Sequence, residues 1–484
     1  MALVLVATFA LAPARADRPN VLFIVCDDLN THVGPSGYPH IQTPNLDKLA
    51  AEGMVFERAY CQYPVCGPSR ASFLSGLYPE STGVLGNKVD IRDTRPNTQS
   101  MPGFFKEQGY WTAGVGKVFH STKHDTGKKD WHENRRFEND ELAIVTRARM
   151  KFEAEHGSVE ERKNRRAWKE IRVKVGGPLT AQTPPGHGPS GLKDEQHKDG
   201  KNARQVIQWL NPGVRDENKP FFIVCGIQKP HVPFLAPDKY FDLYPTNSIS
   251  YIPNPKNDLE DIPKLALVKR AEAFGFEFGK ENDALRRKYM QAYHACISFI
   301  DAQIGLIIDT LQQKNLWDNT IIVLTSDHGY HLGEHYLWGK VTLFEESARV
   351  PLIVRAPGIT KAKSRSQGLV ELLDIFPTLA ELCNLPKPKG TQGQSFRNQL
   401  RDPKAAGRQS AYTVVSRGTQ LGRSIRTSDW RYAEWGKARE PELYDLRNDP
   451  REIHNLAKDV NRRGIRQRMQ TELAMRREAA SAAR

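Results

Sequence analysis

The sequence predicts an α/β fold with a mostly parallel sheet, followed by a smaller α+β region. Short apolar runs rich in branched side chains recur along the chain, which is typical of strands buried on both faces of a parallel sheet. These runs are Asn20–Val25, Phe221–Val224, Ile321–Leu324 and Leu352–Val354. Helical patterns lie between them, at Thr43–Glu52, Ser100–Gln108 and Asn282–Gln313. Strands that alternate with helices favour an α/β architecture.

The end of the chain has a different pattern. A helical pattern at Leu373–Leu385 closes the main unit, and Pro386–Gly393 has the composition of a linker. Two runs beyond it, Ala411–Val415 and Trp430–Trp435, predict antiparallel strands. The final residues, 462–484, predict a basic helix or a frayed tail.

These boundaries predict a large domain over residues 17–385 and a smaller C-terminal subdomain over 386–484. Residues 121–202 are rich in charge, Gly and Pro and poor in apolar periodicity, so we expect a surface insertion with some helix there.

The N-terminus has the pattern of a secretory signal. Ala2–Leu11 is almost wholly apolar, and Ala14-Arg15-Ala16 is a small-x-small cleavage pattern. We therefore expect residues 1–16 to be a signal peptide and the protein to be exported to a periplasmic, extracellular or lysosome-like compartment. A buried N-terminal segment is the alternative. No later run approaches the roughly 20 apolar residues of a membrane span, so none is predicted.

Composition describes a globular protein with a cationic surface. Of 484 residues, 39% are hydrophobic, and the net charge is +14. Much of the positive charge lies in residues 151–174 and 462–484, without a nucleic-acid-binding motif, so no nucleic-acid partner is predicted. Solvated helix faces explain these stretches, although a cationic protein would also attract a polyanion such as a sulfated glycan. The six scattered cysteines predict no disulfide framework.

Two polar pairs follow predicted strands. Asp27-Asp28 follows the first strand, and Asp327-His328 follows Ile321–Leu324. Ligands of open α/β sheets bind beyond the carboxyl ends of the strands. Each pair alone is equally typical of a helix cap, but carboxylates gathered at one edge repel each other unless a cation lies among them. The mostly oxygen ligands suit Ca²⁺ or Mg²⁺, and His328 leaves Mn²⁺ or Zn²⁺ open.

Three loops present cationic side chains. They carry Lys117 with His120, Lys229 with His231, and Lys340. A single Lys or His is usually structural or solvated. Together they predict a cationic pocket opposite the metal, suited to a tetrahedral anionic ester.

The run Cys66-Gly67-Pro68-Ser69-Arg70 resembles the Cys-x-Pro-Ser-Arg signature of the type I sulfatases, in which the Cys is oxidised to formylglycine. Within that family the chain is most similar to the iduronate-2-sulfatase group. The similarity runs through Asp27-Asp28-Leu29, Gly116–His120, Gln228–Phe234, Ser326–His335, Ser424–Thr427, Tyr432 and Glu442–Tyr444. His328 stands where many sulfatases carry Asn, and some choline sulfatases and phosphonate hydrolases share it.

The resemblance implies an alkaline-phosphatase-like sandwich and one Ca²⁺. It implies Asp27, Asp28, Asp327, His328 and the modified Cys66 as metal ligands, with Arg70 polarising the hydrated aldehyde. Lys117, His120, His231 and Lys340 match positions that bind sulfate or move protons, and Lys229 is a weaker candidate. It further implies a formylglycine-generating enzyme as a maturation partner.

An aldehyde hydrate explains why such a nucleophile is useful. A serine would be left as a stable sulfate ester, whereas a hydrate has two hydroxyls on one carbon. One attacks sulfur while an acid, His231, protonates the leaving sugar oxygen; deprotonation of the other by His120 expels sulfate. We therefore predict a sulfuric ester hydrolase acting on a sulfated carbohydrate, with 2-sulfated iduronate or uronate units as the leading substrate. The alternatives are another sulfated polysaccharide, a phosphate or phosphonate ester, and a non-catalytic polyanion binder.

Overall fold

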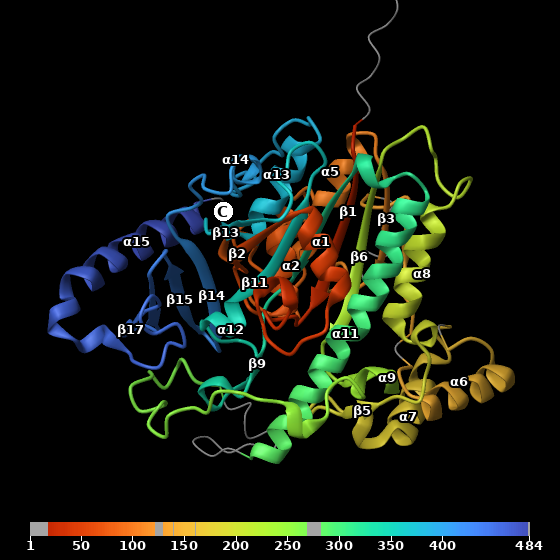
Figure 1. Ribbon diagram of the computed structural model, residues 1–484, viewed down its shortest axis with the longest axis horizontal. Coiled ribbons are helices and arrows are strands. Elements are labelled where there is room, and N and C mark those ends of the chain that lie inside the picture. Colours follow the sequence, from red (N-terminus) through yellow and green to blue (C-terminus); the bar gives the residue numbers. More distant parts are fainter. Residues whose placement is uncertain (1–17, 122–128, 139, 160, 269–281, 483–484) are drawn as a thin grey trace, which may run out of the picture.

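The computed structural model describes residues 18–121, 129–138, 140–159, 161–268 and 282–482. Its centre is a nine-stranded sheet in the order β12-β2-β11-β8-β1-β6-β3-β4, in which β13 also pairs with β2 (Figure 1). The strands are β1 (Asn20–Asp27), β2 (Met54–Tyr60), β3 (Trp111–Gly116), β4 (Glu133–Arg135), β6 (Phe221–Pro230), β8 (Thr320–Ser326), β11 (Arg349–Arg355), β12 (Ser364–Ser366) and β13 (Val370–Glu371). Only β11 runs antiparallel to its neighbours in this described sheet. The predicted mostly parallel sheet is confirmed.

The strand β1 lies at the middle of the sheet, between β6 and β8. Its eight residues are all buried, as are those of β8, which explains why both sequences are continuous apolar runs. The register pairs Cys26 with Ser326. Asp27-Asp28 and Asp327-His328 therefore leave the sheet side by side at the same edge.

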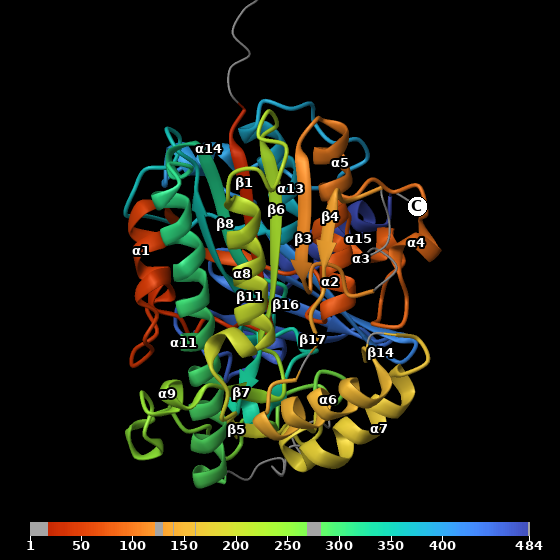
Figure 2. The same ribbon diagram turned by 90° about the vertical axis from the view of Figure 1, so that its right-hand side faces the viewer.

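Helices cover both faces of the sheet (Figures 1 and 2). One face packs Leu22 and Ile24 against α1 (Pro44–Glu52), α8 (Lys198–Leu210) and α11 (Asp283–Gln313). The other packs Val21 and Phe23 against α2 (Cys66–Ser75), α5 (Met101–Glu107) and α13 (Ile375–Leu382). Alternate residues of one strand thus feed two hydrophobic cores, as the period of a strand requires.

The long helix α11 passes a length and composition test for a membrane span. However, 78% of its most apolar window is buried inside the protein, as in the core helix of a globular domain. Its start at Asp283 follows an N-cap, because the Asn282 side chain accepts a hydrogen bond from Leu285 N.

The C-terminal subdomain is a four-stranded antiparallel meander covered by α15 (Arg463–Ser481), as predicted. Its strands are β14 (Ala411–Arg417), β15 (Gln420–Arg426), β16 (Trp430–Trp435) and β17 (Glu440–Asp445). Its core is continuous with side chains of the large domain, including Tyr63, Tyr78 and Phe344. The subdomain therefore packs as part of one molecule.

The predicted surface insertion, residues 121–202, is more mixed than its composition suggests. Two of its helices, α6 (Ala143–His156) and α7 (Arg165–Gly176), form a small peripheral core around Phe152 and Trp168. In contrast, β4 is an edge strand of the central sheet, and Asp199 in the first turn of α8 accepts hydrogen bonds from Gln228 N and Lys229 N of β6. Short parallel pairing to β3 is what brings this charged sequence into the sheet. The predicted signal peptide lies outside the described residues.

Candidate active site

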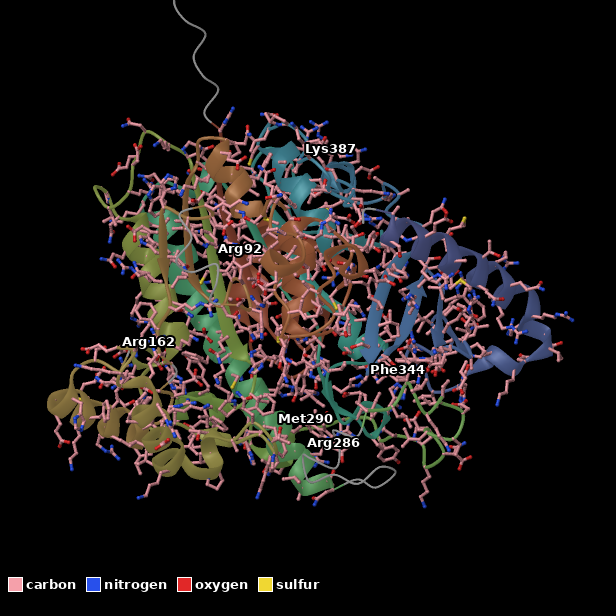
Figure 3. All side chains as sticks on the ribbon, turned by 180° about the vertical axis from the view of Figure 1, so that it is seen from behind. Arg92, Arg162, Arg286, Met290, Phe344 and Lys387 are labelled. Atoms are coloured by element: carbon pink, nitrogen blue, oxygen red, sulfur yellow. The ribbon has the colours of Figure 1, made fainter. Side chains whose placement is uncertain are left out.

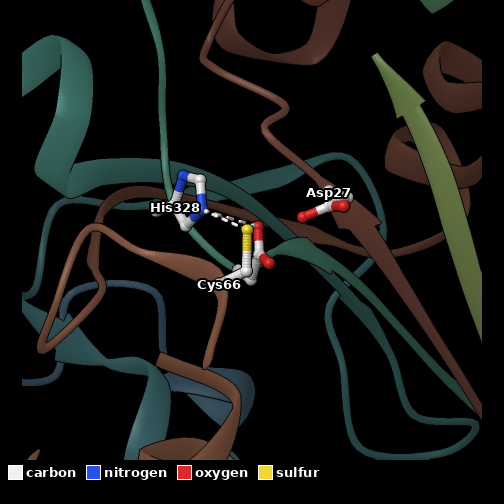
Figure 4. A group of neighbouring side chains, drawn as sticks. Asp27, Cys66 and His328 are labelled. Atoms are coloured by element: carbon white, nitrogen blue, oxygen red, sulfur yellow. Dashed lines mark hydrogen bonds and ion pairs between the residues drawn. The ribbon is translucent and has the colours of Figure 1, made fainter. Parts of the chain in front are cut away.

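The site lies where β1 and β8 end, with the N-terminus of α2 directed at the same point. Figure 4 shows Asp27 at the end of β1, with Cys66 and His328 beside it. Cys66 is the first residue of α2, and its Sγ lies 3.4 Å from His328 Nε2 and 3.1 Å from Lys340 Nζ. A helix N-terminus favours negative charge, so this position suits an anionic group.

A close backbone approach fixes the start of α2. Gly67 N donates to Asn87 Oδ1 at 2.8 Å, and a Cβ built on Gly67 would lie 2.8 Å from that same oxygen. A larger residue would push Asn87 away. Glycine at the second position of the Cys66 run therefore lets the Asn87 side chain cap this backbone N–H.

The predicted metal ligands are brought together. Asp27, Cys66, Asp327 and His328 each offer an atom, and these atoms lie within 4.8 Å of one another. Asp28 joins them, because its Oδ1 lies 3.3 Å from His328 Nε2. All five side chains are buried.

The donor set fits a divalent cation. Asp27 Oδ1 and Asp28 Oδ2 are buried and lack a hydrogen-bond partner among the described residues. A buried carboxylate oxygen without a partner is costly, and a cation removes that cost. His328 Nδ1 faces Gly329 O at 3.0 Å, so that Nδ1 carries the proton and Nε2 keeps its lone pair for a metal.

The guanidinium of Arg70 holds the two acidic strand ends together. Its Nε donates to Asp327 Oδ2 at 2.8 Å, and its Nη2 lies 3.6 Å from Asp27 Oδ1. Nη1 donates to Val118 O at 3.0 Å, and the side chain is fully buried. Arg70 therefore links β1, β8 and the loop after β3.

Two lysines place positive charge beside Cys66. Lys117 Nζ donates to Asp27 Oδ2, and Lys340 Nζ donates to Asp28 Oδ1. Burial would raise the pKa of the Cys66 thiol, and so would Asp27, but Lys117, Lys340 and His328 together lower it well below its usual value. Position 66 therefore stabilises an anion.

The pKa values of the buried acidic residues shift in opposite directions. Burial would raise the pKa of Asp27, but Lys117, His231 and Arg70 hold it well below its usual range. Burial raises the pKa of Asp327 to about 6, despite Arg70. For His328, burial would lower the pKa, yet Asp327, Cys66 and Asp28 together outweigh burial and the pKa rises to about 9. A bound cation would compete with these protons.

Two histidines border the cluster. His231 offers a ring nitrogen within 4.8 Å of ligand atoms of Asp28 and Cys66, and its Nδ1 lies 2.7 Å from Val232 O. Burial first, then Lys117, lowers the pKa of His120 to about 4, so its ring is neutral near pH 7. The two rings therefore supply one candidate proton donor and one candidate acceptor.

Lys229 lies outside this cluster. Its Nζ is fully buried, 2.5 Å from Glu141 Oε2 and 2.6 Å from Pro233 O. It anchors the loop of His231 to the start of the 121–202 segment. Its place in a chemistry-bearing loop predicted a role in binding, but its partners give it a structural one.

The sequence patterns missed Tyr293 of α11. Its hydroxyl donates to Asp28 O at 2.6 Å and accepts from Asn30 N at 2.9 Å, which fixes the turn that presents the acidic pair. Asp28 itself has φ 67°, a left-handed conformation that needs such support. Nothing in the local helical pattern distinguishes Tyr293 from a core residue.

Comparison with known proteins bears on what this site does. Residues 19–385 match the family model described as Sulfatase, and residues 333–479 match one described as N-sulphoglucosamine sulphohydrolase, C-terminal. A sulfatase from Formosa agariphila is 33% identical over 92% of this chain and 84% of its own length. Iduronate 2-sulfatase from Homo sapiens is 30% identical, covering 93% of this chain and 92% of its own length.

Solved structures share the fold. A phosphonate monoester hydrolase of Agrobacterium radiobacter aligns with a TM-score of 0.78 at 22% identity, covering 96% of each chain. A 2-O GAG sulfatase aligns with a TM-score of 0.71 at 23% identity, covering 96% of this chain and 93% of its own. At this identity the likeness establishes the alkaline-phosphatase-like architecture, which confirms the predicted fold class.

Proposed function

The chain belongs to the sulfatase family, whose members hydrolyse sulfate esters, and we propose that its own substrate is a sulfated carbohydrate carrying a 2-O-sulfate on an iduronate or related uronate unit. The observation that carries the proposal is the placement of Cys66 between buried carboxylates and the side chains of Lys117 and Lys340 at one sheet edge. The match to iduronate 2-sulfatase along nearly the whole chain supports the sugar.

We propose that Cys66 is the precursor of formylglycine, and that its Sγ occupies the place of the hydrated aldehyde oxygens. When formed, that group supplies a hydroxyl nucleophile on a carbon from which sulfate can later be expelled. Two facts support the assignment. The position lies at a helix N-terminus, and the lysines around it stabilise negative charge there.

Asp27, Asp28, Asp327 and His328, with the modified residue 66, are proposed to hold one Ca²⁺. The metal would neutralise the clustered carboxylates and polarise an ester oxygen. Oxygen donors predominate in this set, which favours Ca²⁺ over a softer ion. The two carboxylate oxygens without hydrogen-bond partners support a cation here.

The chain's own side chains would then divide the remaining work. Lys117 and Lys340 would bind the sulfate oxygens, and Arg70 would fix the acids and residue 66. His231, beside Cys66, would donate a proton to the leaving sugar oxygen. His120 is neutral near pH 7, so it can accept a proton in the second step.

A phosphonate or phosphate ester is the second candidate, since phosphonate monoester hydrolases share the fold. The two substrates differ mainly in charge, which the site geometry does not separate. The test compares release of sulfate from 2-sulfated uronate disaccharides with release of phosphate from aryl phosphates and phosphonates. It uses enzyme coexpressed with a formylglycine-generating enzyme, and Cys66→Ala as control.

The experiment has three decisive results. Dominant sulfate release that vanishes in Cys66→Ala supports the proposal. Dominant phosphate release contradicts it. Binding of sulfated glycan without turnover, by protein whose residue-66 peptide has the aldehyde mass, would instead favour a non-catalytic polyanion binder.

We also propose export, because the apolar run of residues 2–11 precedes a cleavage pattern. A secreted or periplasmic product whose N-terminus begins just after Ala16 is the expected result. Recovery of uncleaved protein inside the producing cell would contradict it.

A further inference from the structure

A second group of metal-ligand side chains lies next to the catalytic loop, outside the proposed Ca²⁺ site. It consists of His335, Glu346 and Glu452, whose ligand atoms lie within 4.8 Å of one another. We call it the junction cluster. His335 lies between β9 (His331–Leu332) and β10 (Trp338–Gly339), Glu346 lies in α12 (Glu345–Ala348), and Glu452 follows β17.

The cluster joins the two parts of the molecule. The His335 ring stacks on Phe344 at 4.2 Å between centroids, and Figure 3 shows Phe344 where the C-terminal subdomain meets the large domain. Glu345 N donates to Glu452 Oε2 at 2.9 Å, which brings the subdomain against α12. Gly329, next to His328, donates its N–H to Ser347 O at 2.9 Å. The cluster thus borders the loop that carries the catalytic edge.

The imidazole of His335 is oriented as a metal ligand. Its Nδ1 lies 3.1 Å from Asp258 Oδ1, which fixes the proton on Nδ1 and leaves a lone pair on Nε2. A carboxylate behind a histidine is the usual support of a metal-bound imidazole. His335 is 1% exposed, and its Nε2 has no hydrogen-bond partner among the described residues.

Of the two glutamates, Glu346 has a carboxylate oxygen without a hydrogen-bond partner among the described residues, whereas Glu452 is ion-paired with Arg431. Glu346 Oε2 is buried and has no hydrogen-bond partner in the described part of the chain. Burial raises the pKa of Glu346 to about 8; His335 opposes the rise and Glu452 adds to it. Glu452 Oε1 accepts a hydrogen bond from Arg431 Nε. Arg431 is therefore already paired with Glu452. The Oε2 atom of Glu346 can therefore take either a shared proton or a cation.

We propose that the junction cluster binds one divalent transition-metal ion through His335 Nε2 and the carboxylates of Glu346 and Glu452. One imidazole with two carboxylates suits a borderline ion of the Zn²⁺ or Mn²⁺ class better than Ca²⁺, which prefers six or more oxygens. Such an ion would tie the catalytic loop, α12 and the C-terminal subdomain together. It would act on stability, at a site separate from the proposed Ca²⁺ ligands.

The test measures binding of Zn²⁺ by calorimetry and of Co²⁺ by its visible absorption, in excess Ca²⁺ to occupy the catalytic edge. The variants are Glu346→Gln, which keeps the side-chain shape, and Glu452→Gln. The matched control is Glu80→Gln, since Glu80 is also buried and also bridges to the subdomain, through Arg423 and Tyr412. Asp28→Asn reports on the catalytic edge.

We expect wild type, Glu80→Gln and Asp28→Asn to bind one equivalent of Zn²⁺, and Glu346→Gln and Glu452→Gln to bind it at least about 10-fold more weakly. Zn²⁺ at a hundredfold excess over its Kd should raise the wild-type Tm by about 3 °C. That rise should fall to about half or less in Glu346→Gln.

Two results would overturn the proposal. One is wild-type protein that binds neither Zn²⁺ nor Co²⁺ in excess Ca²⁺, which would leave a shared proton in the cluster. The other is Zn²⁺ binding that Asp28→Asn removes and Glu346→Gln retains, which would place the ion at the catalytic edge. Because the wild-type measurement needs no variant, misfolding of one substitution does not obscure the outcome.

Discussion

Two buried groups of charge in this molecule are built on opposite principles. At the contact between the domains, Glu371 and Asp374 meet Arg408 and Arg476, and all four carboxylate oxygens have partners. At the catalytic edge, Asp27 and Asp28 each keep a buried oxygen without a hydrogen-bond partner among the described residues. In a buried charged group that serves stability, the chain itself supplies a partner for every carboxylate oxygen. In a group that binds a ligand, some carboxylate oxygens are left without a partner.

The largest expected effect would separate chemistry from stability at the catalytic edge. Cys66→Ala removes the proposed nucleophile, so sulfate release should fall by about 10⁴-fold or more. The free energy of unfolding should change little, because the described contacts of the Cys66 Sγ are with His328 and Lys340, both in the large domain. Turnover of 2-sulfated disaccharide checks the expected loss of activity, and thermal melting checks the expected stability. An alanine variant that retains activity would remove Cys66 from the mechanism.

At the domain contact, a substitution should lower stability and leave activity unchanged. Arg408→Met leaves two buried carboxylates without their main cation, which should cost about 3–5 kcal/mol of stability. Sulfate release per folded molecule should not change, since the carboxylates that Arg408 contacts, Glu371 and Asp374, are not among the proposed metal ligands or catalytic residues. Denaturant unfolding checks the first expectation, and Arg401→Met, at an exposed arginine, is the control. Equal losses of stability in Arg408→Met and Arg401→Met would show that the ion pairs of Arg408 contribute little to stability.

A substitution at the catalytic edge should cost both activity and the stabilisation that Ca²⁺ provides. Asp28→Asn removes one carboxylate from the proposed Ca²⁺ site, and we expect sulfate release to fall about 10²–10³-fold. Melting in the presence of chelator should report only the cost of breaking the buried Asp28–Lys340 ion pair, whereas the rise in Tm produced by Ca²⁺ should be lost. A Ca²⁺-dependent rise equal to that of wild type would exclude Asp28 as a ligand.

How much of this contrast could be predicted from the sequence depends on the range of the interactions. The acidic pairs could be placed at one edge because parallel strands end together, and the Cys66 run was added to them by its resemblance to the sulfatase signature. Tyr293 and the Lys229–Glu141 ion pair could not, since their partners lie far away in the chain. The strand β4 could not be predicted from the sequence for the same reason. Its charged residues pair as a strand only because β3 is already in place.

The smallest expected effect is a difference in the pH dependence of stability between the catalytic edge and the domain contact. Burial lowers the pKa of His120 to about 4, below the usual value of about 6.5. Between these values the unfolded chain binds a proton that the folded chain does not. The stabilisation is therefore complete above pH 6.5 and is lost as the pH falls toward 4.

Relative to His120→Gln, wild type should lose about 1 kcal/mol of unfolding free energy between pH 7 and 4.5, a reduced value because the ring is partly exposed and its charge is screened. The domain contact has a different window. Burial would raise the pKa of Glu371, but Arg408 and Arg476 lower it, so its stabilisation is present above about pH 4.3 and disappears only at lower pH. Denaturant titrations of both proteins from pH 7 to 3 measure this. Parallel curves for wild type and His120→Gln above pH 4.5 would show that His120 does not titrate as a buried neutral base.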